Sequence, residues 1–312
     1  MNGDIAHRRK VLSLVIDEAC RTIVGQLTAA GQPFIMLKGA TIATWLYPDP
    51  SQRTYVDLDI LVPPGEESSV VDLLRPLGYE PLLSSDTLRV LSPLEQPLRN
   101  RLGVDVDLHI ALKGVRLPPD QAWEILSAST VPWDWAGVSV PALAPPARAM
   151  HLALHLAQLG LVDAKAADDL RLGIARLEHS TWEAATELAG RLQALDAFTA
   201  GLTALPEGQT LAHRLGLSPL ASVEYQMRAA TVFGPAVKLE RFLADQTWRQ
   251  RLSTGRVYLF PSADWLRFHD PEGTNSRRGL VRARIVHPFT ILARAMKAMR
   301  ERRRFRKARS GG

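Results

Sequence analysis

Apolar and polar positions alternate clearly over residues 53–62, Arg-Thr-Tyr-Val-Asp-Leu-Asp-Ile-Leu-Val. Because successive side chains of a strand point to opposite faces, this pattern predicts a short strand with Asp57 and Asp59 on one face. The other face carries Val56, Leu58 and Ile60. Two carboxylates beside buried strand residues are costly unless a cation or a proton balances them. We therefore expect a divalent metal at this strand.

A second alternating segment, residues 103–110, predicts another strand with a polar face. That face carries Asp105, Asp107 and His109. Three acids on two strands fit two-metal nucleotidyl transfer, in which two carboxylates hold Mg²⁺ ions and a third completes one site or orients the attacking hydroxyl. We expect Asp107 to be the third acid and Asp105 to be a solvent-facing neighbour. For His109 we expect a structural role, with a hydrogen bond to a backbone group or an aspartate.

A glycine turn precedes these acids. Residues 34–37 form an apolar run suited to a buried strand, and residues 41–47 have a helical pattern. Gly39 lies between them, where exposed backbone N–H groups and the missing Cβ let an anion approach. Two cationic residues are open to two interpretations each. Lys38 contacts phosphate or lies extended at a strand end, and Arg53 contacts phosphate or forms an ion pair that holds the acids in place.

The remaining pattern predicts an α+β protein, in which a small sheet is followed by helices. Helical periods cover residues 5–30 and 66–75, whereas prolines indicate a loop or short edge elements over residues 81–100. Long Ala/Leu-rich helical patterns extend from residue 147 to about 250, residues 258–273 look irregular, and residues 278–309 form a basic helix. The expected division is an N-terminal helix (1–30), a catalytic domain (31–145), a helical domain (146–275) and a basic tail (276–312).

Composition narrows the class of protein. A hydrophobic fraction of 46% and a charged fraction of 22% are typical of a soluble globular protein. No apolar run approaches the roughly 20 residues of a membrane span, and the polar stretch Met1–Lys10 does not resemble a signal peptide. The single cysteine, Cys20, excludes an internal disulfide and a cysteine-based zinc site. These features favour a cytoplasmic location.

The net charge of +6 hides an uneven distribution. Residues Arg277–Arg309 contain 13 Lys or Arg and one acid, which gives +12, and the rest of the chain, with 25 basic and 31 acidic residues, carries −6. Three roles are open for this tail. It is a solvated helix, a surface that contacts anionic lipid through a face including Ile285 and Phe289, or a non-specific nucleic-acid contact.

The ordered motifs resemble an uncharacterised nucleotidyltransferase family of the DNA polymerase β superfamily. They run in order along the chain as Leu37-Lys38-Gly39, Tyr47-Pro48, Arg53, Asp57-Leu58-Asp59-Ile60-Leu61-Val62, Leu77-Gly78-Tyr79 and Val106-Asp107-Leu108-His109. A looser likeness continues through His151, His155, Asp169-Leu170 and Phe260-Pro261-Ser262. The resemblance implies a small mixed sheet flanked by helices, the polymerase β-like palm, with a helical domain behind it.

The resemblance also implies roles. Asp57, Asp59 and Asp107 would bind two Mg²⁺ ions, and Lys38, Gly39 and Thr41 would contact the phosphates of an NTP. The sequence departs from the superfamily at Ala40, where Gly-Ser is usual after the strand, so a hydroxyl contact is missing unless Thr41 replaces it. A second departure is Ile110, where an aromatic residue commonly follows the Leu-His pair.

Our main expectation is an enzyme that transfers an NMP from an NTP to an unidentified small molecule, peptide or protein. The alternatives are a catalytically inactive nucleotide-binding or regulatory module on the same scaffold, and an accessory protein at a membrane, a nucleic acid or a partner protein. For His151 and His155, one helical turn apart, packing or capping is favoured over contact with the substrate pocket.

Overall fold

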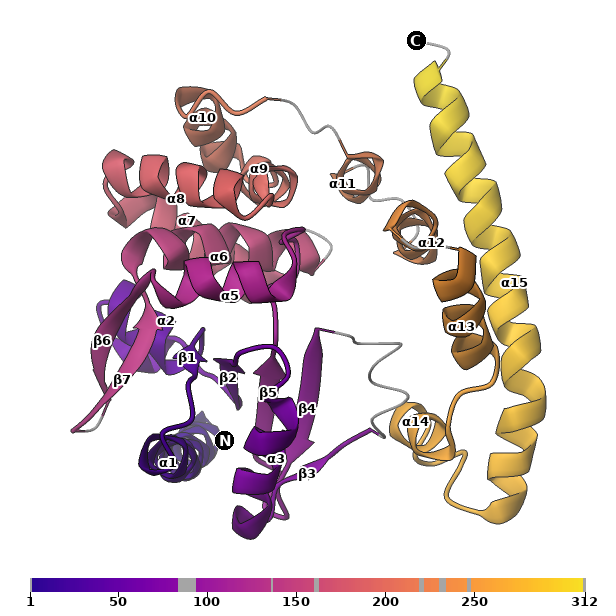
Figure 1. The fold of residues 1–312 in the computed structure, drawn as a ribbon, viewed down its shortest axis with the longest axis horizontal. Helices are drawn as coiled ribbons and strands as arrows, with labels where there is room; N and C mark the ends of the chain where they lie inside the picture. The colour runs from indigo at the N-terminus through magenta and orange to yellow at the C-terminus, as the bar shows by residue number, and fades with distance from the viewer. Residues whose placement is uncertain are drawn as a thin grey trace.

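The computed structural model describes residues 2–83, 94–135, 137–159, 163–218, 222–229, 234–245 and 248–310. Seven strands belong to one sheet (Figure 1): β1 (Ile35–Met36), β2 (Asp57–Leu61), β3 (Glu80–Pro81), β4 (Glu95–Arg99), β5 (Asp105–His109), β6 (Thr130–Trp135) and β7 (Val138–Leu143). The helices of the N-terminal half are α1 (Asn2–Ala29), α2 (Ala40–Leu46), α3 (Glu67–Leu74) and α5 (Pro119–Ser127). Two short 3₁₀ turns, Pro50–Gln52 and Arg75–Leu77, complete this half.

The C-terminal half is helical. Its helices are α6 (Pro145–Gln158), α7 (Ala164–Arg176), α8 (His179–Arg191), α9 (Leu195–Thr203), α10 (Pro206–Arg214), α11 (Val223–Ala229), α12 (Gly234–Asp245), α13 (Trp248–Leu259), α14 (Ala263–His269) and α15 (Arg277–Ser310). Figure 1 shows α6 to α10 stacked above the sheet and α15 along the right-hand side of the molecule. Among the described residues, no helix combines the length and the apolar content that crossing a bilayer requires.

The sheet is mixed, with strand order β3-β4-β5-β2-β1-β7-β6. Strand β2 pairs in parallel with β5 and antiparallel with β1, and β1 pairs in parallel with β7. The expected α+β class is thus confirmed. The pairing of β2 with β5 matters most for the site, because it places the two acidic strands side by side.

Alternation of side chains along the strands gives the sheet two different faces. Leu58 and Ile60 belong to a core cluster with residues of α1 and α3, so this face is covered by the N-terminal helices. Ile35 and Leu61 belong instead to the cluster that extends through α6 to α10. The acids of β2 share the face of Leu61. They therefore lie on the side of the sheet that the helical half covers.

Several predicted elements are observed and others are not. The helix over residues 5–30 and the strand within residues 34–37 are confirmed. The expected boundary between the catalytic domain and the helical domain, at residues 145 and 146, falls at the start of α6. Residues of the sheet and of α6 belong to one hydrophobic core cluster, so the two parts pack against each other across this boundary. The prediction that residues 258–273 are irregular is wrong, because this segment contains helix α14. The N-cap residue of α14, Ser262, accepts a hydrogen bond from Trp265 N.

Two other expectations need correction in detail. Val56 is 60% exposed, because β2 begins only at Asp57 and the residue before it is not covered by the N-terminal helices. In the stretch 81–100, residues 84–93 lie outside the described part of the chain. The described remainder forms the short strands β3 and β4, which extend one edge of the sheet as predicted.

Candidate active site

The acids of β2 and β5 are brought together by the register of the two strands. In the parallel pairing, Asp59 lies opposite Asp107 and Asp57 lies opposite Asp105. Since paired residues of neighbouring strands point to the same face, Asp57, Asp59 and Asp107 share the face toward α6. Asp105 is instead engaged by Arg99 of β4 at 2.5 Å. This agrees with its expected role as a neighbour rather than a site residue.

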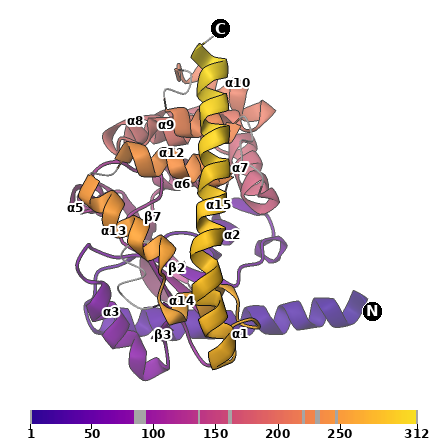
Figure 2. The same cartoon turned by 90° about the vertical axis from the view of Figure 1, so that its right-hand side faces the viewer.

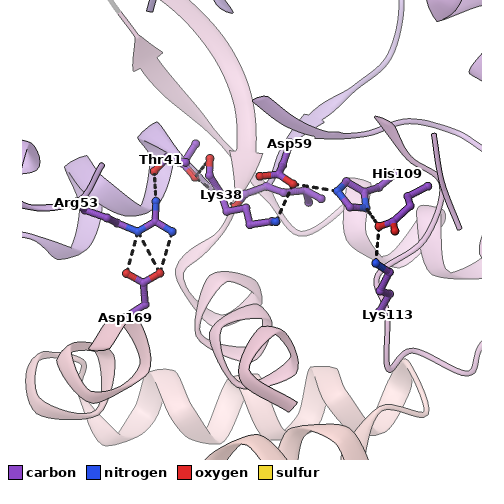
Figure 3. Close-up of polar contacts among 10 residues, drawn as sticks. Lys38, Thr41, Arg53, Asp59, His109, Lys113 and Asp169 are labelled. Carbon is purple, nitrogen blue, oxygen red and sulfur yellow. Dashed lines mark hydrogen bonds and ion pairs between the residues drawn. The ribbon is translucent and has the colours of Figure 1, made fainter. Parts of the chain in front are cut away.

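Asp59 is the centre of a polar network (Figure 3). Its side chain is 1% exposed, and its Oδ1 lies 2.8 Å from Lys38 Nζ and 3.1 Å from His109 Nε2. The other ring nitrogen of His109 lies 3.8 Å from Glu95 Oε2, which in turn lies 2.5 Å from Lys113 Nζ. His109 therefore has the expected structural role of orienting an aspartate. A hydrogen-bonded partner of this kind fixes the orientation of a metal-binding carboxylate.

The environment separates the three acids electrostatically. Burial opposes ionisation of Asp59, but the hydrogen bond from His109 and the charge of Lys38 outweigh it and hold the pKa of Asp59 well below its usual range. Burial and the neighbouring charge of Asp59 raise the pKa of Asp57. The same two causes raise the pKa of Asp107 to about 6. Asp59 is thus permanently charged, whereas Asp107 titrates near neutrality.

This donor set fits a divalent cation. One oxygen or nitrogen ligand atom each from Asp59, Asp107 and His109 lies within 4.8 Å of the others, and Asp57 adds a carboxylate on the same face. Three carboxylates here outnumber the two lysines whose charges act on them, Lys38 and Lys165, so negative charge is in excess. Carboxylate oxygens are the protein ligands that Mg²⁺ prefers. In the described part of the chain, Asp59, Asp107 and His109 form the one cluster of this kind.

Gly39 forms the turn between β1 and α2 with φ of 70°, a conformation that L side chains rarely adopt. A Cβ at this position would lie 3.6 Å from Asp57 O, so the turn runs close to the acidic strand. The carbonyl oxygen of Gly39 accepts a hydrogen bond of 2.9 Å from Arg53 Nη1. Lys38, Gly39 and the acids are therefore gathered in one place, as the sequence predicted.

Arg53 and Thr41 differ from their expected positions. Arg53 forms an ion pair, but with Asp169 of α7 at 2.8 Å rather than with the acids of β2. Tyr47 OH also donates to Asp169, at 2.7 Å. Thr41 is fully buried, and its hydroxyl donates to Leu37 O at 3.2 Å. Its hydroxyl is thus turned toward the backbone of the preceding strand and away from the acids.

His151 and His155 face the site from α6. Together with Lys38, Arg53 and Asp169 they line a small pocket, which Ile42 and Leu152 close on its apolar side. Burial, followed by the charge of Lys38, lowers the pKa of His155 to about 4, and burial and His155 lower the pKa of His151 well below its usual range. Both rings are therefore neutral at physiological pH. His151 is 6% exposed, and the two roles considered from the sequence, packing and contact with the substrate, stay predictions.

One further cation near the site, Lys165 of α7, was not predicted from the sequence. Lost hydration and then the charge of Arg53 lower the pKa of Lys165, while the charges of Asp169 and Asp57 act in the opposite direction. Lys165 does not lie in a local pattern that would indicate a site. Only the packing of α7 on the rest of the fold brings it there.

Known proteins resemble this chain at the level of a family and of a solved structure. A model of the family described as uncharacterised nucleotidyltransferase matches residues 7–207. No curated protein matches the chain. Among solved structures, the chain is similar to the antibiotic-resistance factor ANT(2'')-Ia, with 15% sequence identity, a TM-score of 0.41, and coverage of 58% of this chain and 94% of that chain. Because the family match spans more than half of the chain and contains all three acids, the chain belongs to this nucleotidyltransferase family.

Proposed function

We propose that this protein is a Mg²⁺-dependent nucleotidyltransferase that transfers an NMP from an NTP to an acceptor, which is a small molecule, a peptide or a protein. The observation that carries the proposal is the pairing of Asp59 with Asp107 across β2 and β5, with Asp57 on the same face and Lys38 at 2.8 Å from Asp59. A cytoplasmic setting, where NTPs and Mg²⁺ are abundant, is part of the proposal.

In this proposal Asp57, Asp59 and Asp107 hold two Mg²⁺ ions. The bound ions would supply charge stabilisation for the triphosphate and for the leaving pyrophosphate, and would lower the pKa of the attacking hydroxyl. Asp59 is suited to bind a metal ion because Lys38 and His109 keep its carboxylate ionised. Asp107, which lies opposite Asp59 across the two strands, would complete one metal site and orient the attacking hydroxyl of the acceptor.

The remaining residues would bind and orient the substrate. Lys38 Nζ, 20% exposed at the side chain, is the cation available to the phosphates, and the Gly39 turn lets them approach the backbone. Arg53 acts indirectly, because its guanidinium holds the Gly39 carbonyl and Asp169 at once. His151 and His155, neutral and directed at the same pocket, would contact the acceptor side of the site.

The test is transfer by purified protein. Candidate acceptors are incubated with ATP, CTP, GTP or UTP and Mg²⁺, and products are followed by mass spectrometry together with pyrophosphate release. We expect Asp57→Asn and Asp59→Asn to lower turnover at least about 100-fold without loss of fold, since each removes a charged ligand. Asp107→Asn should lower turnover more than NTP affinity.

Asp105→Asn is the matched control. It removes a carboxylate of the same strand that is paired with Arg99 outside the site, so turnover should stay within about twofold of the wild-type value. Full activity of an Asp57→Asn/Asp59→Asn double variant would refute the metal assignment.

A second candidate function is a nucleotide-binding or regulatory module without catalysis. The specific observation in its favour is Thr41, whose hydroxyl is bonded to Leu37 O and so does not replace the hydroxyl missing at Ala40. Calorimetry with Mg²⁺ and each NTP separates the two functions. Binding without pyrophosphate release, in the presence of every acceptor tried, would favour the module.

A further inference from the structure

Helix α15 has an apolar stripe on its exposed side. The apolar stripe consists of Val281, Ile285, Phe289, Leu292, Met296 and Met299, which are 43–70% exposed. Their spacing of four, four, three, four and three residues keeps them on one face of an α-helix over about 27 Å. Six large apolar side chains in one continuous exposed line are unusual for a soluble surface and indicate an interaction site.

Packing within the chain uses the opposite face of α15. Ala298 is 1% exposed in a cluster with Met227, Ala236 and Val237, and it lies about 180° around the helix from Phe289. Arg302 forms an ion pair with Glu240 of α12, and His287 Nε2 lies 3.0 Å from Tyr258 O of α13. Figure 2 shows α15 in front of the helices it contacts, with its outer side uncovered. The apolar stripe is therefore not a face that this fold buries.

Arginines border the apolar stripe. At about 100° per residue, Arg282 and Arg300 lie on one side of it and Arg277 and Arg284 on the other, while Arg278 and Arg303 continue its line at both ends. All six are exposed, and none forms an ion pair within the described part of the chain. At the first turns of the helix, arginines and apolar residues line one shallow surface depression together.

We propose that α15 binds an anionic lipid surface, lying in the plane of the interface with the apolar stripe among the acyl chains and the bordering arginines on headgroup phosphates. At the surface of an anionic bilayer, the negatively charged headgroups lie directly beside the hydrocarbon of the acyl chains. The apolar stripe with arginines on both sides is complementary to this arrangement.

Two other occupants match the surface less well. A second copy of α15 would bring arginine borders against arginine borders, and the helix has only Glu301 to offset them. A nucleic acid would engage the arginines but leave the apolar stripe in water, because the stripe contains one aromatic ring on which a base could stack. The lipid assignment does not depend on the proposed transfer reaction.

The test is flotation of the full chain with vesicles of phosphatidylcholine alone or with about 30 mol% phosphatidylglycerol. We expect the wild type to float only with the anionic vesicles. The variant Ile285→Gln/Phe289→Gln/Leu292→Gln should lower partitioning at least about tenfold, because it removes three exposed apolar groups from the interface. Arg282→Gln/Arg300→Gln should lower it by about tenfold or more, and added salt should weaken wild-type binding.

The matched control is Leu102→Gln/Leu159→Gln/Leu195→Gln, which removes three exposed leucines outside α15 and should float like the wild type. Circular dichroism establishes that each variant is folded. Absence of wild-type flotation, or equal flotation of the stripe and control variants, would overturn the proposal. So would a stripe variant that only converts a dimer to a monomer in light scattering, or wild-type protein that binds duplex nucleic acid but no vesicle.

Discussion

Arg53 and Asp169 form a buried, bidentate ion pair that links the segment before β2 to helix α7. Arg53 Nε lies 2.8 Å from Asp169 Oδ1 and Nη2 lies 2.8 Å from Oδ2, with the two side chains 4% and 3% exposed. The same guanidinium holds Gly39 O at 2.9 Å. One arginine therefore ties the turn beside the acids to the helical half of the molecule.

Breaking this pair should destabilise the fold. Asp169→Asn leaves the Arg53 charge buried without its partner, so we expect a loss of about 3–5 kcal/mol in the free energy of unfolding, measured by urea denaturation. Arg53→Lys should also be destabilising, because an ammonium cannot reproduce the two parallel bonds. Asp168→Asn is the control: its exposed pair with Arg171 should contribute less than about 1 kcal/mol. Equal stability of the two Asn variants would contradict this role of Asp169.

Divalent metal should stabilise the native protein. The site gathers three carboxylates, and a ligand that binds only the folded state stabilises it by an amount that grows with the logarithm of its concentration above the dissociation constant. At about ten times its dissociation constant, Mg²⁺ should add about 1.4 kcal/mol and raise the Tm by about 2–4 °C. Asp107→Asn should remove most of this shift, whereas Asp105→Asn should retain it. A shift reproduced by NaCl at equal ionic strength would speak against a specific site.

His155 should make the protein less stable in mild acid. Its pKa is about 4 in the folded state and about 6.5 in the unfolded state, so between these values the unfolded chain takes up a proton that the folded protein does not. Stability is therefore fully present above pH 6.5 and falls as the pH decreases toward 4, by up to about 3 kcal/mol.

The variant that checks this is His155→Gln, which cannot ionise. Its unfolding free energy should depend less on pH between 7.5 and 5 than that of the wild type. Lys38, Arg53, Asp59 and Asp169, whose charges act on His155, are unchanged in the variant, and the neighbouring His151, whose pKa His155 also lowers, stays in place, so the comparison reports on His155 and its coupling to His151. Parallel pH profiles for the two proteins would exclude His155 as the source.

Close packing of α6 on α9 should depend on Gly201. A Cβ at this position would lie 2.0 Å from Ala153 O, a backbone atom that cannot move aside without moving the helix. Gly201→Ala should therefore cost about 1–3 kcal/mol in urea denaturation. At Gly190 the nearest atom is 3.9 Å away, so Gly190→Ala should instead stabilise the protein by up to about 1 kcal/mol. Similar effects of the two substitutions would show that α6 and α9 are not in such close contact.

The local patterns of the chain were sufficient to predict the strands β1, β2 and β5, but they did not predict β6 and β7. Alternation over residues 53–62 and 103–110 specifies which side chains share a face, because the side-chain period of a strand is two residues. The same pattern places Asp57 and Asp59 on one face of their strand and Asp105 and Asp107 on one face of theirs, and what separates Asp105 from the others is its ion pair with Arg99. The run from an apolar strand through Gly39 to a helical pattern likewise predicted a turn at this glycine, and the positive φ observed there is one that glycine tolerates.

Tertiary structure decided what no local pattern contains. The parallel register of β2 with β5 sets Asp59 opposite Asp107, and the docking of α7 turns Arg53 toward Asp169, more than one hundred residues away in sequence. The same packing buries the Thr41 hydroxyl against Leu37 O and leaves the apolar stripe of α15 uncovered. Periodicity specifies the face of an element on which a residue lies. Which partner that face meets depends on long-range packing, and so it was decided only by the assembled fold.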